Sequence, residues 1–234
     1  MSSTHYLDTL LFAVLPYLAF FTFFLVTIQR YRMRSFSYSS LSSQFLENQQ
    51  HFWSLVPFHY GILAVLTGHF IGFLIPREVL AFNSRPLRLY MLEVTGLIFG
   101  LMTLVGLAAA IWRRITEPKI RRVTNVSDWI VFALLVLQVV TGIDVALFHP
   151  WGSSWFAATA SPYLWSLLKL NPEIGAIAAM PLTVKLHIVN AYVLIGFFPF
   201  TRLVHILVVP NPYLWRKPQV VRWNWQPGAR REGS

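Results

Sequence analysis

Apolar residues run along this chain in five long stretches, separated by shorter segments that hold most of its charged residues. Each stretch has at least the roughly 20 residues that a helix needs to cross the hydrocarbon layer of a membrane. The pattern therefore predicts an all-α integral membrane protein, a five-transmembrane-helix bundle that forms one membrane domain over residues 1–234. The predicted helices cover residues 8–28, 55–75, 89–112, 128–148 and 181–209.

Composition supports the membrane assignment. Hydrophobic residues make up 56% of the chain and charged residues 12%, with a mean hydropathy of +0.54, which is unlike a soluble domain. The first apolar stretch follows no basic segment and precedes Arg30, Arg32 and Arg34, so we expect it to remain as a helix rather than to be cleaved as a signal peptide. The segment 151–180 is broken by prolines and carries several tryptophans, which predicts an interfacial loop with a short helix.

Charge predicts the orientation. The net charge is +10, and most of the 19 Lys and Arg residues follow the first, third and fifth predicted helices. The positive-inside rule then places the N-terminus outside and the C-terminal tail, residues 210–234, in the cytoplasm. Because the basic residues are divided among membrane loops, they favour anionic lipid headgroups or a cytoplasmic protein partner over nucleic acid.

Histidine is the candidate ligand in this chain. There is no cysteine, which excludes disulfides, thiolate-bound iron–sulfur clusters and covalently attached haem. Of the seven histidines, four lie inside predicted helices, where an ionisable residue is costly and indicates function. These are His59 and His69 on the second helix, and His187 and His205 on the fifth. A single one of them could serve packing alone, but two on each of two helices favour a shared role.

Helix geometry predicts how the four histidines pair. His59 and His69 are about 15 Å apart along a helix axis, and His187 and His205 about 27 Å. The second and fifth helices run antiparallel, so His59 lies level with His205 on the cytoplasmic side and His69 with His187 on the outer side. The two spacings differ by some 6 Å at each end, which helix tilt would have to absorb.

A group held between two imidazoles in a helical bundle is most simply a haem with two axial histidines. Zinc would require further Cys or carboxylate ligands at the same depth, and the sequence provides none. Gly61, Gly68 and Gly196 would leave room for a flat macrocycle, or would allow close helix packing. Arg202 would face the propionates of the inner haem and Lys185 those of the outer one, or both would only extend toward the membrane surface.

Three stretches resemble the gamma subunit of membrane-bound respiratory nitrate reductase, in the same order and within a similar total length. They are SSQFLE at residues 42–47, FHYGILAVLTGHFIGFLIP at 58–76 and FTRLVHILVVPNPYLWRKPQVVR at 200–222. The first helix, with LPYL at 15–18 and the arginines after it, is also similar. Between residues 83 and 180 the resemblance lies mainly in the number of helices and not in sequence motifs.

The resemblance implies a dihaem cytochrome b in a prokaryotic cytoplasmic membrane that oxidises quinol, menaquinol or ubiquinol, near its outer face. Electrons would pass to an iron–sulfur beta subunit and a molybdenum-containing alpha subunit that reduces nitrate. It implies two haem b, with His59 and His205 binding the inner haem iron and His69 and His187 the outer one. It also implies a quinol site near Gly68, His69 and Arg88, where Arg88 or Arg85 stands in place of an expected lysine.

Aromatic and arginine residues in the tail predict that it docks the iron–sulfur subunit, together with the SSQFLE loop. Three other interpretations stay open. The chain could be a cytochrome b subunit of another cytoplasmic reductase, of the heterodisulfide- or sulfite-reduction type. It could be a transporter that uses its histidines as a proton relay, although it has no inverted repeat. It could also be a membrane anchor whose histidines only pack.

Overall fold

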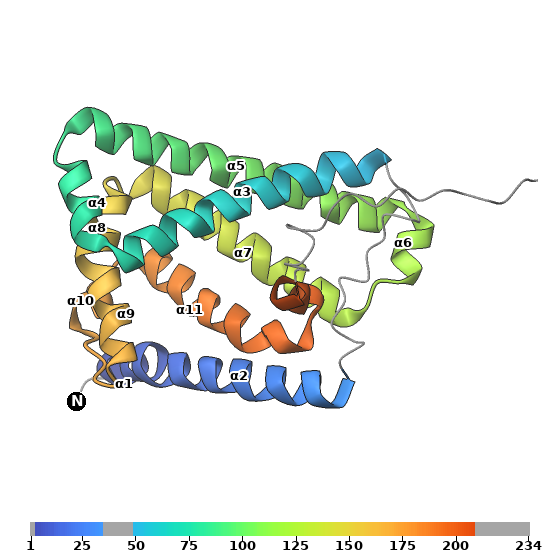
Figure 1. The fold of residues 1–234 in the computed structure, drawn as a ribbon, viewed down its shortest axis with the longest axis horizontal. Coiled ribbons are helices and arrows are strands. Elements are labelled where there is room, and N and C mark those ends of the chain that lie inside the picture. The colour runs from blue at the N-terminus through green and yellow to red at the C-terminus, as the bar shows by residue number, and fades with distance from the viewer. Residues whose placement is uncertain (1–2, 35–48, 209–234) are drawn as a thin grey trace, which may run out of the picture.

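A computed structural model describes residues 3–34 and 49–208 of the chain (Figure 1). The SSQFLE loop at 42–47 and the tail from residue 209 lie outside the described residues. The part of the chain that the structure describes is helical and contains no strand. Five of its helical segments are long and apolar enough to cross a membrane: His5–Met33, Trp53–Leu74, Pro86–Thr116, Val126–Phe148 and Leu182–Phe200. The predicted all-α membrane fold is confirmed.

The first span consists of α1 (Ser3–Thr9), the π-helical turn η1 (Leu10–Val14) and α2 (Leu15–Arg34). The next three spans are α3 (Gln49–Leu74), α5 (Pro86–Thr116) and α7 (Val126–Phe148). The fifth is α11 (Leu182–Phe197), followed by the 3-10 turns η4 (Phe198–Phe200) and η5 (Arg202–Val208). Shorter helices connect them: α4 (Pro76–Asn83), α6 (Pro118–Arg122), α8 (Gly152–Trp155), η3 (Phe156–Ala160), α9 (Ser161–Leu168) and α10 (Gly175–Ala178).

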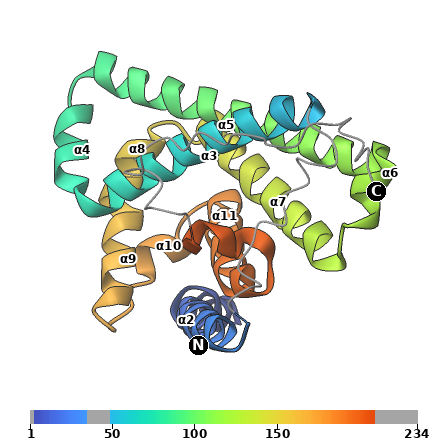
Figure 2. The ribbon, with the colours of Figure 1, turned by 45° about the vertical axis from the view of Figure 1, so that its right-hand side comes forward.

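Neighbouring spans alternate in direction along the bundle (Figure 1). The closely packed pairs are α3 with α5, α5 with α7, α7 with α11, and α11 with α2. Figure 2 shows α2 at one edge of the bundle and α5 at the other, with α3, α7 and α11 between them. Among the described spans, α3 and α11 are therefore not a closely packed pair, although both border the middle of the bundle.

Segment 151–180 is more ordered than the predicted loop, because it folds into α8, η3, α9 and α10 at one end of the bundle (Figure 1). Side chains of this segment donate hydrogen bonds to backbone carbonyls that have no N–H partner within their own helix. Pro16 has no N–H to offer to the Phe12 carbonyl one turn earlier, and the Tyr163 hydroxyl donates to that carbonyl at 2.8 Å. Burial raises the pKa of Tyr163 to about 12, so the hydroxyl keeps its proton.

A side chain of the same segment also donates a hydrogen bond to a backbone carbonyl at the end of α3. The helix stops at Leu74 because Pro76 begins α4, which leaves the Phe73 carbonyl without a helical partner. Trp165 Nε1 donates to this carbonyl at 3.0 Å, and the Trp165 ring stacks on Phe73 at a centroid distance of 5.0 Å. Segment 151–180 thus fixes the end of α3 that carries His69.

The fifth span does not continue as one α-helix to residue 209, as the sequence predicted. It ends at Phe197 and passes through a 3-10 turn, and Thr201 is extended with φ −117° and ψ 178°. Pro199 lacks the N–H that the helix would need, which explains the break. Arg30 on α2 donates to the carbonyls of Pro199 at 2.6 Å and Thr201 at 3.0 Å, which the break leaves without helical donors. The segment η5, with His205, then turns away from the line of α11 (Figure 1).

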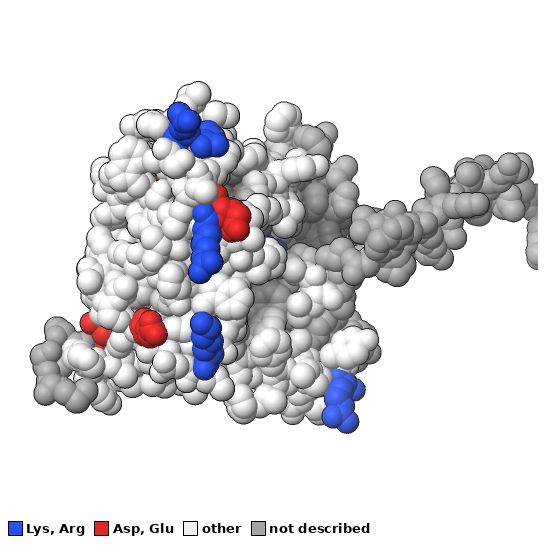
Figure 3. All heavy atoms as spheres, turned by 60° about the vertical axis from the view of Figure 1, so that its left-hand side comes forward, with Lys and Arg blue, Asp and Glu red and all other residues white. Residues whose placement is uncertain are grey.

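Large apolar side chains remain exposed along the spans, for example Phe21 at 66%, Leu63 at 60% and Val105 at 64%. Figure 3, which brings forward the end with α4 and α8–α10, shows a few charged side chains on a mostly uncharged surface. The exposed apolar side chains along the spans suit contact with lipid, and the bundle is a multi-pass membrane protein.

Candidate functional site

His69 on α3 and His187 on α11 face each other across the bundle. Their ring centroids are 6.3 Å apart and their planes differ by 32°. Two imidazoles that bind one metal ion from opposite sides, each at a metal–nitrogen distance of about 2 Å, have centroids roughly 6 Å apart. The spacing of this pair therefore suits an iron between the rings, and the pair is the one that the antiparallel helices predicted for the outer side.

Hydrogen bonds to the ring nitrogens show which nitrogen is free to act as a ligand. The Nδ1 atoms lie 2.7 Å from the Leu55 carbonyl in His59, 2.9 Å from the Val65 carbonyl in His69 and 2.6 Å from the Arg202 carbonyl in His205. A carbonyl oxygen only accepts, so each Nδ1 carries the proton and each Nε2 keeps its lone pair. This is the tautomer of a histidine that binds metal through Nε2.

His187 has side-chain partners instead. Its Nδ1 lies 3.0 Å from the Thr141 hydroxyl on α7, and its Nε2 lies 3.1 Å from the amide nitrogen of Gln138. Gly142 leaves room for the ring, because a Cβ at this position would lie 3.0 Å from its Cε1. The bond from the Asn190 amide to Gln138 Oε1, at 2.7 Å, orients the Gln138 side chain.

His59 and His205 lie beside a second part of the core. Phe58 and Leu203 pack against the same buried cluster, which consists of Leu107, Val131 and Leu135. His59 is exposed and His205 is partly buried. The sharing of one haem by these two histidines stays a prediction.

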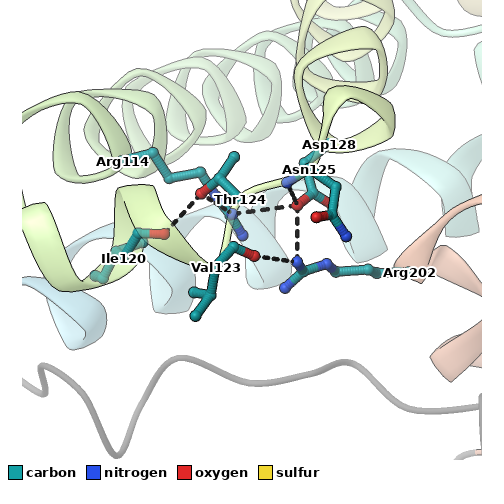
Figure 4. A network of polar contacts seen from close by, with 7 residues as sticks. All are labelled: Arg114, Ile120, Val123, Thr124, Asn125, Asp128 and Arg202. Atoms are coloured by element: carbon teal, nitrogen blue, oxygen red, sulfur yellow. Dashed lines mark hydrogen bonds and ion pairs between the residues drawn. The ribbon is translucent and has the colours of Figure 1, made fainter.

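Arg202 joins a polar network at the end of the bundle that carries α6 (Figure 4). Its guanidinium lies 2.9 Å from the buried Asp128 carboxylate and donates to the Val123 carbonyl at 2.6 Å. The same carboxylate oxygen lies 3.6 Å from Arg114 and accepts from the Asn125 N–H at 2.9 Å, which caps α7. The described contacts of Arg202 thus hold η5 to α7, and a role toward haem propionates stays a prediction.

At the opposite end, Lys185 forms an ion pair with Asp8 at 3.2 Å, which joins α11 to α1. Two of the three glycines that were candidates for haem contact serve helix packing. A Cβ on Gly61 would lie 2.7 Å from the Phe99 carbonyl on α5, and one on Gly196 would lie 3.4 Å from Ala19 on α2. Gly68, by contrast, has open space where its Cβ would be, directly beside His69.

The three predicted quinol-site residues lie on two helices. His69 and Gly68 are exposed near the end of α3. Arg88 lies at the start of α5, with its guanidinium 5.2 Å from the centre of the Phe82 ring and 3.4 Å from the Ser84 hydroxyl. The described contacts of Arg88 are with the α4 side, so its membership of a shared site with His69 stays a prediction.

Sequence reasoning missed Phe156, whose ring lies edge-on to His69 at 5.2 Å, and the α7 residues around His187. For α7 a signal was present, because Gln138 and Thr141 are polar residues within an apolar span, as is Asn190 on α11. Phe156 gave no such signal, because an aromatic residue in an interfacial segment is expected. Within the described residues, no three His, Cys, Asp or Glu side chains form a common metal site.

The model of the family described as nitrate reductase gamma subunit matches residues 8–224. The chain belongs to this family. It is 30% identical over 216 residues to the nitrate reductase gamma chain of Bacillus subtilis (strain 168), covering 91% of this chain and 97% of the relative. It is 31% identical over 225 residues to the respiratory nitrate reductase 2 gamma chain of Escherichia coli (strain K12), covering 93% and 97%.

A more distant similarity extends over part of the chain. One of the subunits of the dihydromethanophenazine:CoB–CoM heterodisulfide reductase of Methanosarcina barkeri (strain Fusaro / DSM 804) is 24% identical over 127 residues. The match covers 54% of this chain and 42% of that relative. The gamma-chain relatives cover nearly the full length, so they are the better guide to function.

Proposed function

We propose that the chain is the dihaem cytochrome b subunit of a quinol-oxidising nitrate reductase. It oxidises quinol near the outer face of a prokaryotic cytoplasmic membrane. Its partners are an iron–sulfur beta subunit and a molybdenum-containing alpha subunit, on which nitrate is reduced. The observation that carries this proposal is the pair of facing imidazoles, His69 and His187, at 6.3 Å in a member of the gamma-subunit family.

His69 and His187 hold the outer haem, and His59 and His205 the inner one. In His59, His69 and His205 the Nδ1 proton is bound by a carbonyl, so Nε2 would be free to bind iron. In His187 the Nδ1 proton is bound by Thr141, and Nε2 would have to exchange its contact with the Gln138 amide nitrogen for the iron. The two haems, when bound, accept and release electrons singly and so connect the outer face of the membrane to the inner face. His205 lies on η5 rather than on α11, so its position is not tied to the axis of the helix that carries His187.

Quinol is the substrate at the outer end, near Gly68 and His69. The open space at Gly68 allows a flat ring to approach α3, and the edge of Phe156 closes one side of the His69 imidazole. Arg88 supplies a positive charge at the same end of the bundle, where a hydrogen bond to a ring oxygen would assist proton release. Protons released here would leave on the outer side.

The beta subunit docks at the end of the bundle that carries Arg30, Arg114 and Arg202, which is the cytoplasmic end in this proposal. The loop at 42–47 and the C-terminal tail bind it there. The full-length similarity to gamma chains favours nitrate reductase partners over a heterodisulfide- or sulfite-reducing complex. A transporter or a membrane anchor would not bind haem. Haem content therefore separates the redox proposal from both.

The proposal is tested on membranes that contain the chain with its partner subunits. Addition of a quinol should reduce haem b, seen in the reduced-minus-oxidised spectrum, and nitrate should then reoxidise it. A membrane without a haem b signal would overturn the cytochrome assignment. Haem that is reduced by quinol but not reoxidised by nitrate would overturn the nitrate reductase assignment alone.

A further inference from the structure

The four proposed ligands differ in what holds their Nδ1 protons. In His59, His69 and His205 the acceptor is a backbone carbonyl three or four residues earlier in the same segment. In His187 the partner is the side chain of Thr141, on a different helix. One ligand of the outer pair is thus oriented by α7, and a single substitution can remove its acceptor.

The direction of the bonds around His187 follows from the partners at either end. The Thr141 hydroxyl donates to the Leu137 carbonyl at 2.7 Å, so its oxygen remains to accept a proton from Nδ1 at 3.0 Å. On the other side, Asn190 Nδ2 donates to Gln138 Oε1 at 2.7 Å, which leaves the Gln138 amide nitrogen to face the ring, 3.1 Å from Nε2 and 3.3 Å from Nδ1. Both ends therefore give the same tautomer, with the proton on Nδ1 and the lone pair on Nε2. The Gln138 nitrogen would have to leave Nε2 for an iron to bind there.

The residues that make these hydrogen bonds around His187 are buried, so water cannot take their place. Thr141 is 7% exposed and Asn190 is 4% exposed, and Asn190 also donates to the Leu134 carbonyl at 3.0 Å. Polar groups at such depth keep the partners they have, because no water replaces a lost bond. The His187 ring is further confined by Gly142, where a Cβ would contact it.

We propose that Thr141 is a positioning residue that fixes the orientation of His187 and lowers the midpoint potential of the outer haem. This inference rests on the proposed function. A hydrogen bond from Nδ1–H to the hydroxyl oxygen increases electron donation from the imidazole to the iron, and so stabilises the oxidised form.

The test is a redox titration of both haems in the purified complex, followed by absorbance and by electron paramagnetic resonance. Thr141→Val removes the acceptor and should raise the midpoint potential of the outer haem while the inner haem keeps its own. Thr141→Ser restores the hydroxyl and should return the potential to the wild-type value. If Thr141→Val does not assemble, Thr141→Ala takes its place. It removes the hydroxyl without adding a methyl group, and it should raise the potential in the same way.

Thr103→Val is the matched control, because Thr103 is also buried and its hydroxyl also donates to a carbonyl four residues earlier, that of Phe99 at 2.7 Å. It should leave the outer potential unchanged. An unchanged outer potential in Thr141→Val and Thr141→Ala, or no recovery in Thr141→Ser, would overturn the inference and leave the proposed function intact. Absence of haem from the wild-type complex would overturn both.

Discussion

An imidazole inside a membrane helix needs a partner for each ring nitrogen, because water is not present to supply one. In all four candidate histidines, three within the spans and His205 on η5, the Nδ1 atom has a partner, which is a carbonyl of the same segment or Thr141. Their Nε2 atoms carry the lone pairs that an iron would accept. At the scale of single residues, the candidate site is therefore a set of four histidines in one tautomer.

Two glycines on α3 have opposite surroundings, which gives a matched pair of substitutions. Gly61→Ala places a Cβ 2.7 Å from the Phe99 carbonyl and 2.8 Å from the Thr103 nitrogen, so it should lower the free energy of unfolding by roughly 1–3 kcal/mol. Gly68→Ala meets open space and should change stability by no more than about 1 kcal/mol, in the favourable direction, since alanine favours a helix. Denaturation of the solubilised protein followed by tryptophan fluorescence measures both.

The pair also separates packing from substrate binding. Because Gly68→Ala leaves the helix packing intact, an increase in KM for quinol in this variant reports on the quinol site. Equal stability of the two variants would contradict the assignment of Gly61 to packing against α5.

The residues that could be predicted from the sequence are those that differ from their apolar surroundings. His69 and His187 are ionisable residues within apolar stretches, and helix direction was enough to predict that they meet. The orienting role of Thr141 was not predictable, because it depends on the rotation of α7 about its axis. Gly61 and Gly196 gave the same sequence signal as Gly68, and only their neighbours in space distinguish them.

At the scale of elements, the break in the fifth span has the largest consequence. The 27 Å estimate for His187 and His205 assumed one straight helix, and the chain leaves that helix at Phe197. The apolar stretch of the sequence continues beyond Pro199, so hydropathy gives no sign that the helix ends there. The predicted fifth helix was therefore too long. Because His205 lies on η5, its position is not fixed by the axis of α11. The mismatch between the His59–His69 and His187–His205 spacings, which was derived for a straight helix, therefore no longer applies.

The Asp128 carboxylate holds η5 to α7, which gives the second prediction. Asp128→Asn keeps the size of the side chain but removes the charge that pairs with Arg202 and Arg114. It should lower the free energy of unfolding by roughly 3 kcal/mol, because the pair is largely buried. The inner haem should also be lost more readily, since the Arg202 carbonyl holds the ring of His205.

Asp8→Asn is the control, because it breaks the ion pair with Lys185 at the other end of the bundle. That pair is more exposed, so its loss should cost about 1 kcal/mol or less and leave the inner haem in place. Thermal denaturation and haem content per protein measure both effects. Equal losses of inner haem in the two variants would contradict a specific role of Asp128 toward His205.

At the scale of the whole molecule, the two ends of the bundle differ in charge. Arg30, Arg114 and Arg202 form bonds at one end, while Lys185 and Asp8 pair at the other. The positive-inside rule predicts that the arginine-rich end faces the cytoplasm, where the partner subunits would bind.

The chain has no cysteine of its own, so single cysteines can report this orientation without background. In intact spheroplasts, Lys169→Cys should react with a membrane-impermeant maleimide and Lys119→Cys should not. In inverted vesicles the order should reverse. Labelling of Lys119→Cys in intact spheroplasts would contradict the predicted orientation.

Electron paramagnetic resonance of four histidine variants tests the central claim, two haems each shared by α3 and the fifth span. In the complex with its partner subunits, His69→Ala and His187→Ala should each abolish one and the same haem signal. His59→Ala and His205→Ala should each abolish the other. Loss of a single common signal in His59→Ala and His187→Ala, or retention of both signals in all four variants, would contradict the account.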